Sequence, residues 1–202
     1  MGNITIELFN PNDFIEVANV VATAMVTNPT MKAVFRGIDE NEKKQRLSAS
    51  FEILFKYAPS ETHIARIHNK IVGAVRISSS PYCLAPPPEA GQMLEPLMKK
   101  ALKSSYDRHN ELFSVWIKND LKEPHLHLGP NAVLPDFQGQ GIATQVLSLV
   151  CKRIDSEGKT AFLETDKIEN VRLYSRFGFT EVNQTTEPFG VTSYFMRRSP
   201  KS

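Results

Sequence analysis

A short glycine-bearing stretch, Leu134 to Thr144, carries the residues best suited to hold a ligand. It lies between an apolar, strand-like segment and an amphipathic helix, and Gly139 and Gly141 fall two residues apart within it. Glycine lets a backbone turn tightly and approach a ligand without a Cβ atom in the way. The first turn of a helix leaves N–H groups unpaired and carries partial positive charge, so this junction can hold a phosphate without a basic side chain.

The same stretch differs from two common nucleotide-binding loops. No Gly-Lys-Ser/Thr follows the glycines, which argues against a Walker-type loop, and no third glycine stands at the dinucleotide-binding spacing. A diphosphate cradle of another kind therefore remains, with an ordinary turn as the alternative.

Tyr174 is the next candidate for chemistry. Asn170 precedes it by four residues and so shares its face of a helix. A tyrosine hydroxyl held beside a departing group can act as a proton donor. The alternative for Tyr174 is a half-buried core aromatic whose hydroxyl reaches the rim.

His125 and His127 lie two residues apart on a predicted strand and share one face of it. An imidazole can take a proton from an amine, which is mostly charged at neutral pH because a lysine-like pKa is about 10.4. The sequence shows no third ligand for a metal at this pair, so we expect no metal. Glu164 on the following strand is a second candidate base, with a solvent-facing carboxylate as its alternative.

These stretches together resemble the GNAT N-acetyltransferase superfamily. Its loop pattern, Gln/Arg-x-x-Gly-x-Gly/Ala, is filled here by Gln138, Gly141 and Ala143. Its Leu-Tyr-x-x-x-Gly-Phe element is similar to the run from Leu173 to Phe179. Many members place an alanine and an earlier asparagine before the Leu-Tyr pair, and the position of Asn170 departs from that pattern.

The resemblance implies that the chain binds acetyl-coenzyme A (acetyl-CoA). The residues implied to hold it are Ala132, Val133, Leu134, Gln138, Gly139, Gln140, Gly141, Ile142, Ala143, Thr144 and Asn170. Backbone groups of the first three would pair with the pantetheine arm as an added strand, and a donor at Val133 would polarise the thioester carbonyl. The N–H groups from Gln138 to Thr144 would hold the pyrophosphate, with both glutamines contributing mainly main chain.

The resemblance also implies catalytic roles and a reaction. Tyr174 would protonate the leaving thiolate. His127 lies at the position along the strand from which several members present a general base. Glu164 or water stays open as the base, and the alternative for His127 is a structural histidine that is hydrogen-bonded by its neighbours. No cysteine lies in either motif, so we expect direct transfer to a primary amine. A small-molecule amine is favoured because no acidic cluster suits a polycationic substrate. A protein amine, a non-catalytic acyl-CoA sensor and a general phosphate-binding domain are the alternatives.

The acceptor site carries no readable motif. We expect residues 28–37, residues 79–122 and the final strand pair to shape it. Four aromatic residues in or beside these segments could form its walls or pack in the core: Phe35, Tyr82, Trp116 and Phe189.

The composition is that of a globular protein. The chain has 202 residues, and acids and bases spread along it leave a net charge of +2, which argues against a nucleic-acid partner. No signal segment or membrane-length apolar run is present, so we expect a cytoplasmic protein with no membrane contact. Cys83 and Cys151 are expected to be reduced thiols. Dimers are common in the superfamily, and a homodimer is kept open.

Hydrophobic spacing predicts the elements that position these residues. The predicted strands are residues 3–9, 62–68, 71–78, 125–133, 161–165, 179–185 and 191–197. Helices are predicted from Asn10, from Asp39, across residues 90–122, after Gly141 and from Asp166 or Asn170, with a hairpin turn at Asn69-Lys70. The apolar segment 161–165 suits a central parallel strand.

This order predicts a mixed α/β layer fold. We expect one domain, 1–202, with an insertion at about 80–124 that crosses one end of the sheet. The resemblance implies a mostly antiparallel, twisted GNAT-like sheet with a central parallel strand pair, flanked by helices.

Overall fold

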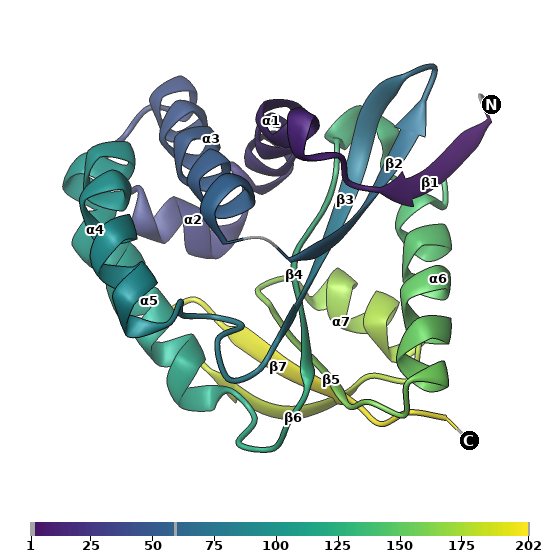
Figure 1. The fold of residues 1–202 in the computed structure, drawn as a ribbon. Coiled ribbons are helices and arrows are strands. Elements are labelled where there is room, and N and C mark those ends of the chain that lie inside the picture. Colours follow the sequence, from purple (N-terminus) through teal and green to yellow (C-terminus); the bar gives the residue numbers. More distant parts are fainter. Residues whose placement is uncertain (1–2, 59, 202) are drawn as a thin grey trace.

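Within residues 3–58 and 60–201, which the computed structural model describes, seven strands form one sheet in the order β1-β2-β3-β4-β5-β7-β6 (Figure 1). The strands are β1 (Ile4–Leu8), β2 (Glu61–Ile67), β3 (Lys70–Ser79), β4 (Leu126–Val133), β5 (Ala161–Thr165), β6 (Thr180–Thr185) and β7 (Ser193–Arg198). Neighbouring strands are antiparallel except β4 and β5, which are parallel. The predicted mixed, mostly antiparallel sheet with a central parallel pair is confirmed.

Helices cover both faces of this sheet (Figure 1). They are α1 (Phe14–Met25), α2 (Pro29–Val34), α3 (Glu40–Tyr57), α4 (Pro88–Leu102), α5 (Tyr106–Asn119), α6 (Ile142–Ser156) and α7 (Ile168–Ser175). On one face, Val17 and Val21 of α1 pack against Ile64 and Ile71 of the sheet. On the other face, α6 buries a stripe at helical spacing against β3 and β5.

Asn10 caps the short 3-10 turn Pro11–Asp13 that leads into α1, and Asp39 caps α3, both as predicted. The Asn10 side chain accepts a hydrogen bond from Asn12 N at 2.9 Å, and the Asp39 side chain accepts one from Glu42 N at 3.0 Å. Each carboxyl or amide oxygen satisfies a donor that the first turn leaves unpaired.

Two local predictions were wrong. The turn between β2 and β3 is His68-Asn69, one residue earlier than expected, because both residues adopt positive φ (48° and 63°) as a tight hairpin turn requires. Neither Asp166 nor Asn170 caps α7, whose N-cap is Lys167. Asp166 instead accepts hydrogen bonds from the N–H and hydroxyl of Thr30, so a tertiary contact replaces the local one.

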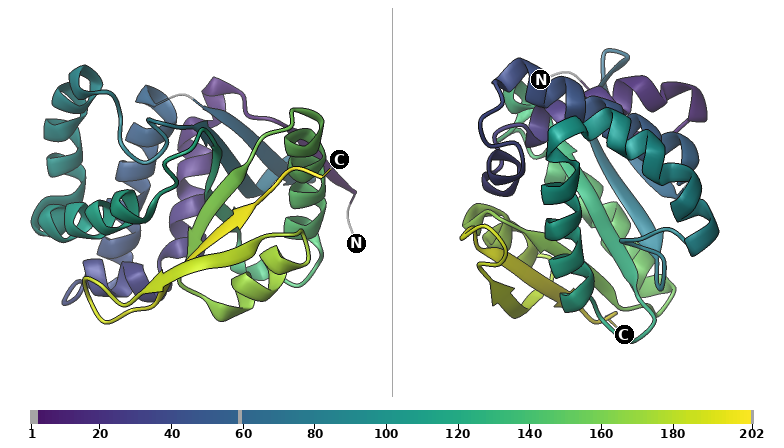
Figure 2. Two further views of the ribbon diagram at one scale, coloured as in Figure 1. Left: turned by 90° about the horizontal axis from the view of Figure 1, so that it is seen from below. Right: turned by 90° about the vertical axis from the view of Figure 1, so that its left-hand side faces the viewer.

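The helices α4 and α5 stand on the side of the molecule away from α6 (Figure 2). Leu102 of α4 and Leu112 of α5 are buried in one cluster with Met31, Phe35 and Leu47. Residues 88–119 therefore extend the core around α2 and α3. None of the helices in the described part of the chain combines the length and hydropathy needed to cross a membrane.

Leu163, at the centre of β5, gives a direct test of this core. It is 0% exposed, so Leu163→Ala should lower the free energy of unfolding by about 2–5 kcal/mol through lost burial and a residual cavity. Val182→Ala on the edge strand β6 is the control: Val182 is 49% exposed, and the change expected is within about 0.5 kcal/mol. Urea denaturation measures both, and equal losses would contradict the placement of β5 in the core.

Candidate active site

The parallel strands β4 and β5 diverge after a short contact. Their pairing is limited to Leu126 with Ala161 and His127 with Phe162, whereas β4 continues to Val133 beside β3. The register between β3 and β4 shifts at Arg76 of β3. Two residues of β4, Gly129 and Pro130, lie opposite this single residue. The β5-facing edge of the last residues of β4 is therefore open.

The backbone of Val133 faces this open edge. Leu134 N donates to Val72 O at 2.8 Å, so residues 134 and 72 form a hydrogen-bonded pair of the antiparallel ladder. The adjacent pair, Gly73 and Val133, must then turn its N–H and C=O groups away from one another. Of the three strand residues expected to meet a ligand, Val133 is thus the one whose main chain points outward.

The glycine-bearing loop lies just beyond. Gly139 and Gly141 have φ of 75° and 79°, in the left-handed region that favours glycine, as the sequence predicted. A Cβ built at either position would find no atom within 4 Å among the described residues, so the backbone borders open space. The first bond of α6 runs from Gln145 N to Gly141 O, which leaves the N–H groups of residues 142–144 without partners inside the helix.

Both glutamines of the loop brace it through their side chains. Gln138 Nε2 donates to Val133 O at 3.0 Å, and Gln140 Nε2 donates to Asp136 O at 3.1 Å. The backbone N–H of Gln138 already donates to Pro135 O. The N–H groups of Gln138 to Thr144 were all expected to face a phosphate; in this structure those from Gly139 onward are better placed than that of Gln138.

Tyr174 lies on α7 and is 6% exposed. Its hydroxyl oxygen accepts a hydrogen bond from Asn131 Nδ2 at 3.1 Å, so its own hydrogen is free to be donated elsewhere. Burial raises the pKa of Tyr174 to about 12; the Asn131 bond opposes the rise, and Glu164 and Asp166 add to it. The phenol is therefore protonated at neutral pH, as a proton donor must be.

A cavity of about 610 Å³ opens beside Tyr174. Its polar lining includes Asn131, Glu164 and Asn170, and its apolar walls come from α3, α4 and α5. Tyr82 and Trp116 line it, as proposed for an acceptor site. Phe35 is fully buried in the core and Phe189 packs against that core, so neither forms this wall.

His127 and Glu164 form a pair on the cavity wall. His127 is 1% exposed, and its Nε2 lies 3.0 Å from Glu164 Oε2, although the two are not aligned as a hydrogen bond. Burial alone would lower the pKa of His127, but the nearby Glu164 carboxylate and Cys83 reverse this and raise it to about 9. Glu164 is thus a half-buried carboxylate paired with His127, rather than a solvent-facing carboxylate.

Arg76 is the one other buried cation of this lining. It is 6% exposed and donates to Ala58 O, Gly129 O and Ser78 Oγ, and no carboxylate of the described residues lies within ion-pair distance. Burial lowers the pKa of Arg76 to about 10. Arg76 therefore brings to the lining a positive charge that, among the described residues, is held only by neutral hydrogen-bond acceptors.

Two features of this region escaped sequence analysis. The first is Asn131, which directly precedes the strand residues expected to bind a ligand and contacts Tyr174. The only sequence signal for it was a polar residue within an apolar strand. Cys83 and Asp120 lie beside His125 and His127, although the sequence offered no third ligand for the histidine pair. Asn170, expected to contact a ligand, donates to Thr165 Oγ1 at 3.0 Å while lining the cavity.

Comparison with known proteins gives a family for this architecture. The sequence profile of the protein family described as the Acetyltransferase (GNAT) family matches residues 31–179. A solved structure described as histone acetyltransferase HPA2 and related acetyltransferase, from Corynebacterium glutamicum, is 20% identical with a TM-score of 0.72, and the match covers 100% of this chain and 98% of that chain.

Two further solved structures were described with acetyl-CoA. A GNAT family acetyltransferase from Brucella melitensis in complex with acetyl-CoA is 16% identical, with a TM-score of 0.54 and coverage of 100% of this chain and 91% of that chain. The yncA protein from Salmonella typhimurium, with its cofactor acetyl-CoA, is 13% identical, with a TM-score of 0.58 and coverage of 99% and 95%. At these identities the likeness shows a shared fold.

Proposed function

The chain belongs to the GNAT acetyltransferase family, and from this premise we propose that it moves the acetyl group of acetyl-CoA to a primary amine of a small molecule by direct attack. Acetyl-CoA supplies the activated acetyl thioester. The sections of the chain that would hold it are the open edge of β4 and the loop before α6. The backbone of these two sections is what would fit this cosubstrate.

The fit rests on two features. Left-handed glycines at 139 and 141 present the backbone to open space, where a diphosphate can approach amide groups at the start of α6. The diverging strands leave the outward N–H of Val133 available to an extended amide-bearing arm, which would lie along this edge as an added strand; the Val133 carbonyl already accepts from the Gln138 side chain. Of the proposed contacts, Ala132 and Leu134 flank this edge, and the Gln138 and Gln140 side chains shape the loop.

The observation that carries the catalytic proposal is the Asn131–Tyr174 hydrogen bond at the cavity wall. Asn131 donates to the phenol oxygen and would stabilise the negative charge that develops as Tyr174 releases its proton. Tyr174 Oη would deliver that proton to the departing sulfur. Asn170, on the same helix, would help to orient the bound arm.

We assign the proton acceptor for the incoming amine to the His127–Glu164 pair. Both residues line the cavity that holds Tyr174 and Asn131, and their side chains lie 3.0 Å apart. An amine entering this cavity would meet the pair on its wall, directly or through one water.

The cavity favours a small acceptor. Its volume of about 610 Å³ falls within the range of small-molecule sites, and α4 and α5 wall it with apolar side chains. The charge of Arg76 would suit an acceptor that also carries an anionic group. The separate buried thiols Cys83 and Cys151 agree with the cytoplasmic location that we propose.

A panel of amines tests this function. The full chain is incubated with acetyl-CoA and each amine, and free thiol and acetylated product are measured together. We expect thiol release that depends on a small amine and matches product one to one. The panel should contain matched amines with and without a carboxylate, and the same amine presented at the end of a peptide.

Three outcomes separate the alternatives. Acetyl-CoA binding without amine-dependent thiol release across the panel would identify a sensor. Preference for the peptide-borne amine over its free counterpart would move the acceptor class to proteins. Binding of inorganic diphosphate without preference for the pantetheine-bearing ligand would indicate a general phosphate site.

A further inference from the structure

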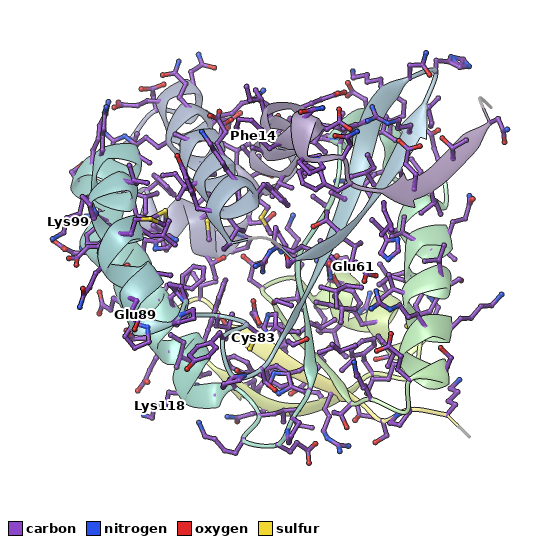
Figure 3. All side chains as sticks on the ribbon, in the orientation of Figure 1. Phe14, Glu61, Cys83, Glu89, Lys99 and Lys118 are labelled. Atoms are coloured by element: carbon purple, nitrogen blue, oxygen red, sulfur yellow. The ribbon has the colours of Figure 1, made fainter. Side chains whose placement is uncertain are left out.

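We propose that Cys83, Asp120, His125 and His127 form a binding site for one divalent metal ion of the Zn²⁺ class, behind the acceptor cavity. The four side chains come from three separate parts of the chain, and one ligand atom from each lies within 4.8 Å of the others. Cys83 follows β3, Asp120 follows α5, His125 lies just before β4 and His127 is the second residue of that strand. Figure 3 shows Cys83 in the interior, over the strands and beside the end of α5.

The spacing of these atoms matches tetrahedral coordination. Cys83 Sγ lies 3.6 Å from His125 Nε2 and 3.2 Å from Asp120 Oδ2, and His125 Nε2 lies 3.0 Å from Asp120 Oδ1. With Zn–S of about 2.3 Å and Zn–N or Zn–O of about 2.0 Å, a tetrahedral site separates its ligand atoms by about 3.3–3.6 Å. The contacts among Cys83, Asp120 and His125 are near this size, and the four ligand atoms lie within 4.8 Å of one another, so side-chain shifts would let all four reach one ion.

The hydrogen bonding of His125 turns its Nε2 toward the cluster. His125 Nδ1 lies 2.9 Å from Glu123 O, a carbonyl that can only accept, so Nδ1 carries the hydrogen of the neutral ring. Without an ion, Nε2 forms an ion pair with the Asp120 carboxylate and lies beside the Cys83 sulfur; a bound ion would take the place of the proton on Nε2 and meet its lone pair there. The Nδ1 bond is the outer contact that metal-bound histidines usually make.

His127 provides a second, independent indication. Its side chain is buried, and in the described part of the chain neither ring nitrogen has a hydrogen-bond partner, which is rare for a buried polar group. Its Nε2 lies beside the Glu164 carboxylate, so Nδ1 is available as a metal ligand. Metal-bound histidines commonly hold a carboxylate on their other ring nitrogen, and this arrangement leaves Glu164 as the proton acceptor toward the cavity.

The geometry differs from that of a nucleophilic cysteine. In a Cys–His–carboxylate triad the thiol and the carboxylate contact opposite nitrogens of the imidazole. Here the sulfur and the Asp120 carboxylate both face Nε2 of His125. The three donor atoms therefore surround one common point, where a shared ion would sit.

The ligand set selects the class of ion. A thiolate with two imidazoles favours Zn²⁺ over Mg²⁺ or Ca²⁺, which prefer oxygen. One thiolate, one carboxylate and two neutral imidazoles balance a divalent charge. Four protein ligands close the site, so its role would be to hold the end of α5 and the segment around Cys83 against β4.

Cobalt titration of the full chain tests the site without acetyl-CoA. After removal of metal with a chelator, Co²⁺ is added and its absorption recorded, followed by displacement with Zn²⁺. We expect one Co²⁺ per chain, with visible bands of tetrahedral cobalt and a thiolate-to-metal charge-transfer band. Cys83→Ser should remove the charge-transfer band and weaken Zn²⁺ binding by at least about 100-fold, more than loss of a group that only hydrogen-bonds to a ligand costs.

The other cysteine provides a matched control. Cys151 is as buried as Cys83, at 6% exposed, but lies in α6 outside the cluster, so Cys151→Ser should keep the full spectrum. If Cys83→Ser fails to fold, an unchanged spectrum in Cys151→Ser still assigns the sulfur ligand to Cys83, because the chain has only these 2 cysteines. No stoichiometric Co²⁺ binding by the wild-type chain, or loss of the charge-transfer band in Cys151→Ser, would overturn the proposal. Because acetyl-CoA binding is measured separately, either result leaves the proposed transferase activity standing.

Discussion

Gly141→Glu is expected to raise the dissociation constant for acetyl-CoA by at least about 100-fold, which corresponds to about 2.7 kcal/mol. Position 141 has a φ of 79°, so any side chain strains the backbone there. The carboxylate would also project into the open space in which we place the pyrophosphate, at the positive end of α6. Isothermal titration calorimetry with coenzyme A and acetyl-CoA measures the effect.

Gly158→Glu separates this local effect from backbone strain. Gly158 lies just beyond the other end of α6, also with a left-handed φ (62°) and with open space around an added Cβ. The two variants thus add the same charge to the same kind of backbone position, and only Gly141→Glu should lose affinity. Unchanged affinity in Gly141→Glu would place the cosubstrate elsewhere.

Tyr174→Phe is expected to lower kcat by at least about 100-fold, a typical contribution for general acid catalysis. The change removes only the hydroxyl that Asn131 contacts, so acetyl-CoA affinity should stay within a few-fold. Because the pKa of Tyr174 is about 12, the wild-type phenol stays protonated across neutral and mildly alkaline pH. The deficit should therefore be the same at each pH in that range.

Tyr57→Phe is the control for this substitution. Tyr57 ends α3, is 39% exposed and lies outside the cavity that holds Tyr174. Its loss should leave kcat unchanged. Equal turnover in the wild type and Tyr174→Phe would remove this hydroxyl from the mechanism and return the aromatic ring to a packing role.

Much of the scaffold could be predicted because its signals are local. Alternating apolar residues and the left-handed positions at Gly139 and Gly141 depend on neighbours in the sequence, and β5 has the predicted bounds. The cap of α7 failed for the opposite reason. Asp166 is used by Thr30, which is distant in sequence, and no local pattern could reveal that contact.

The site was predictable only where it follows short motifs. The loop and Tyr174 stand within such motifs, whereas the Asn131 contact depends on how α7 packs beside β4. The cluster around Cys83 needs residues from three segments to converge, and the spacing of Cys83, Asp120 and His125 in the sequence is not that of a familiar metal motif. Only the tertiary structure brings these side chains together.

The apolar wall formed by α4 and α5 has a consequence for how such a protein could change over evolutionary time. In our proposal, acceptor recognition and cosubstrate recognition reside in different stretches of the polypeptide, since helices α4 and α5 border the cavity while the glycine loop lies between β4 and α6. New specificities could arise by exchanging that one stretch, with the chemical steps inherited intact.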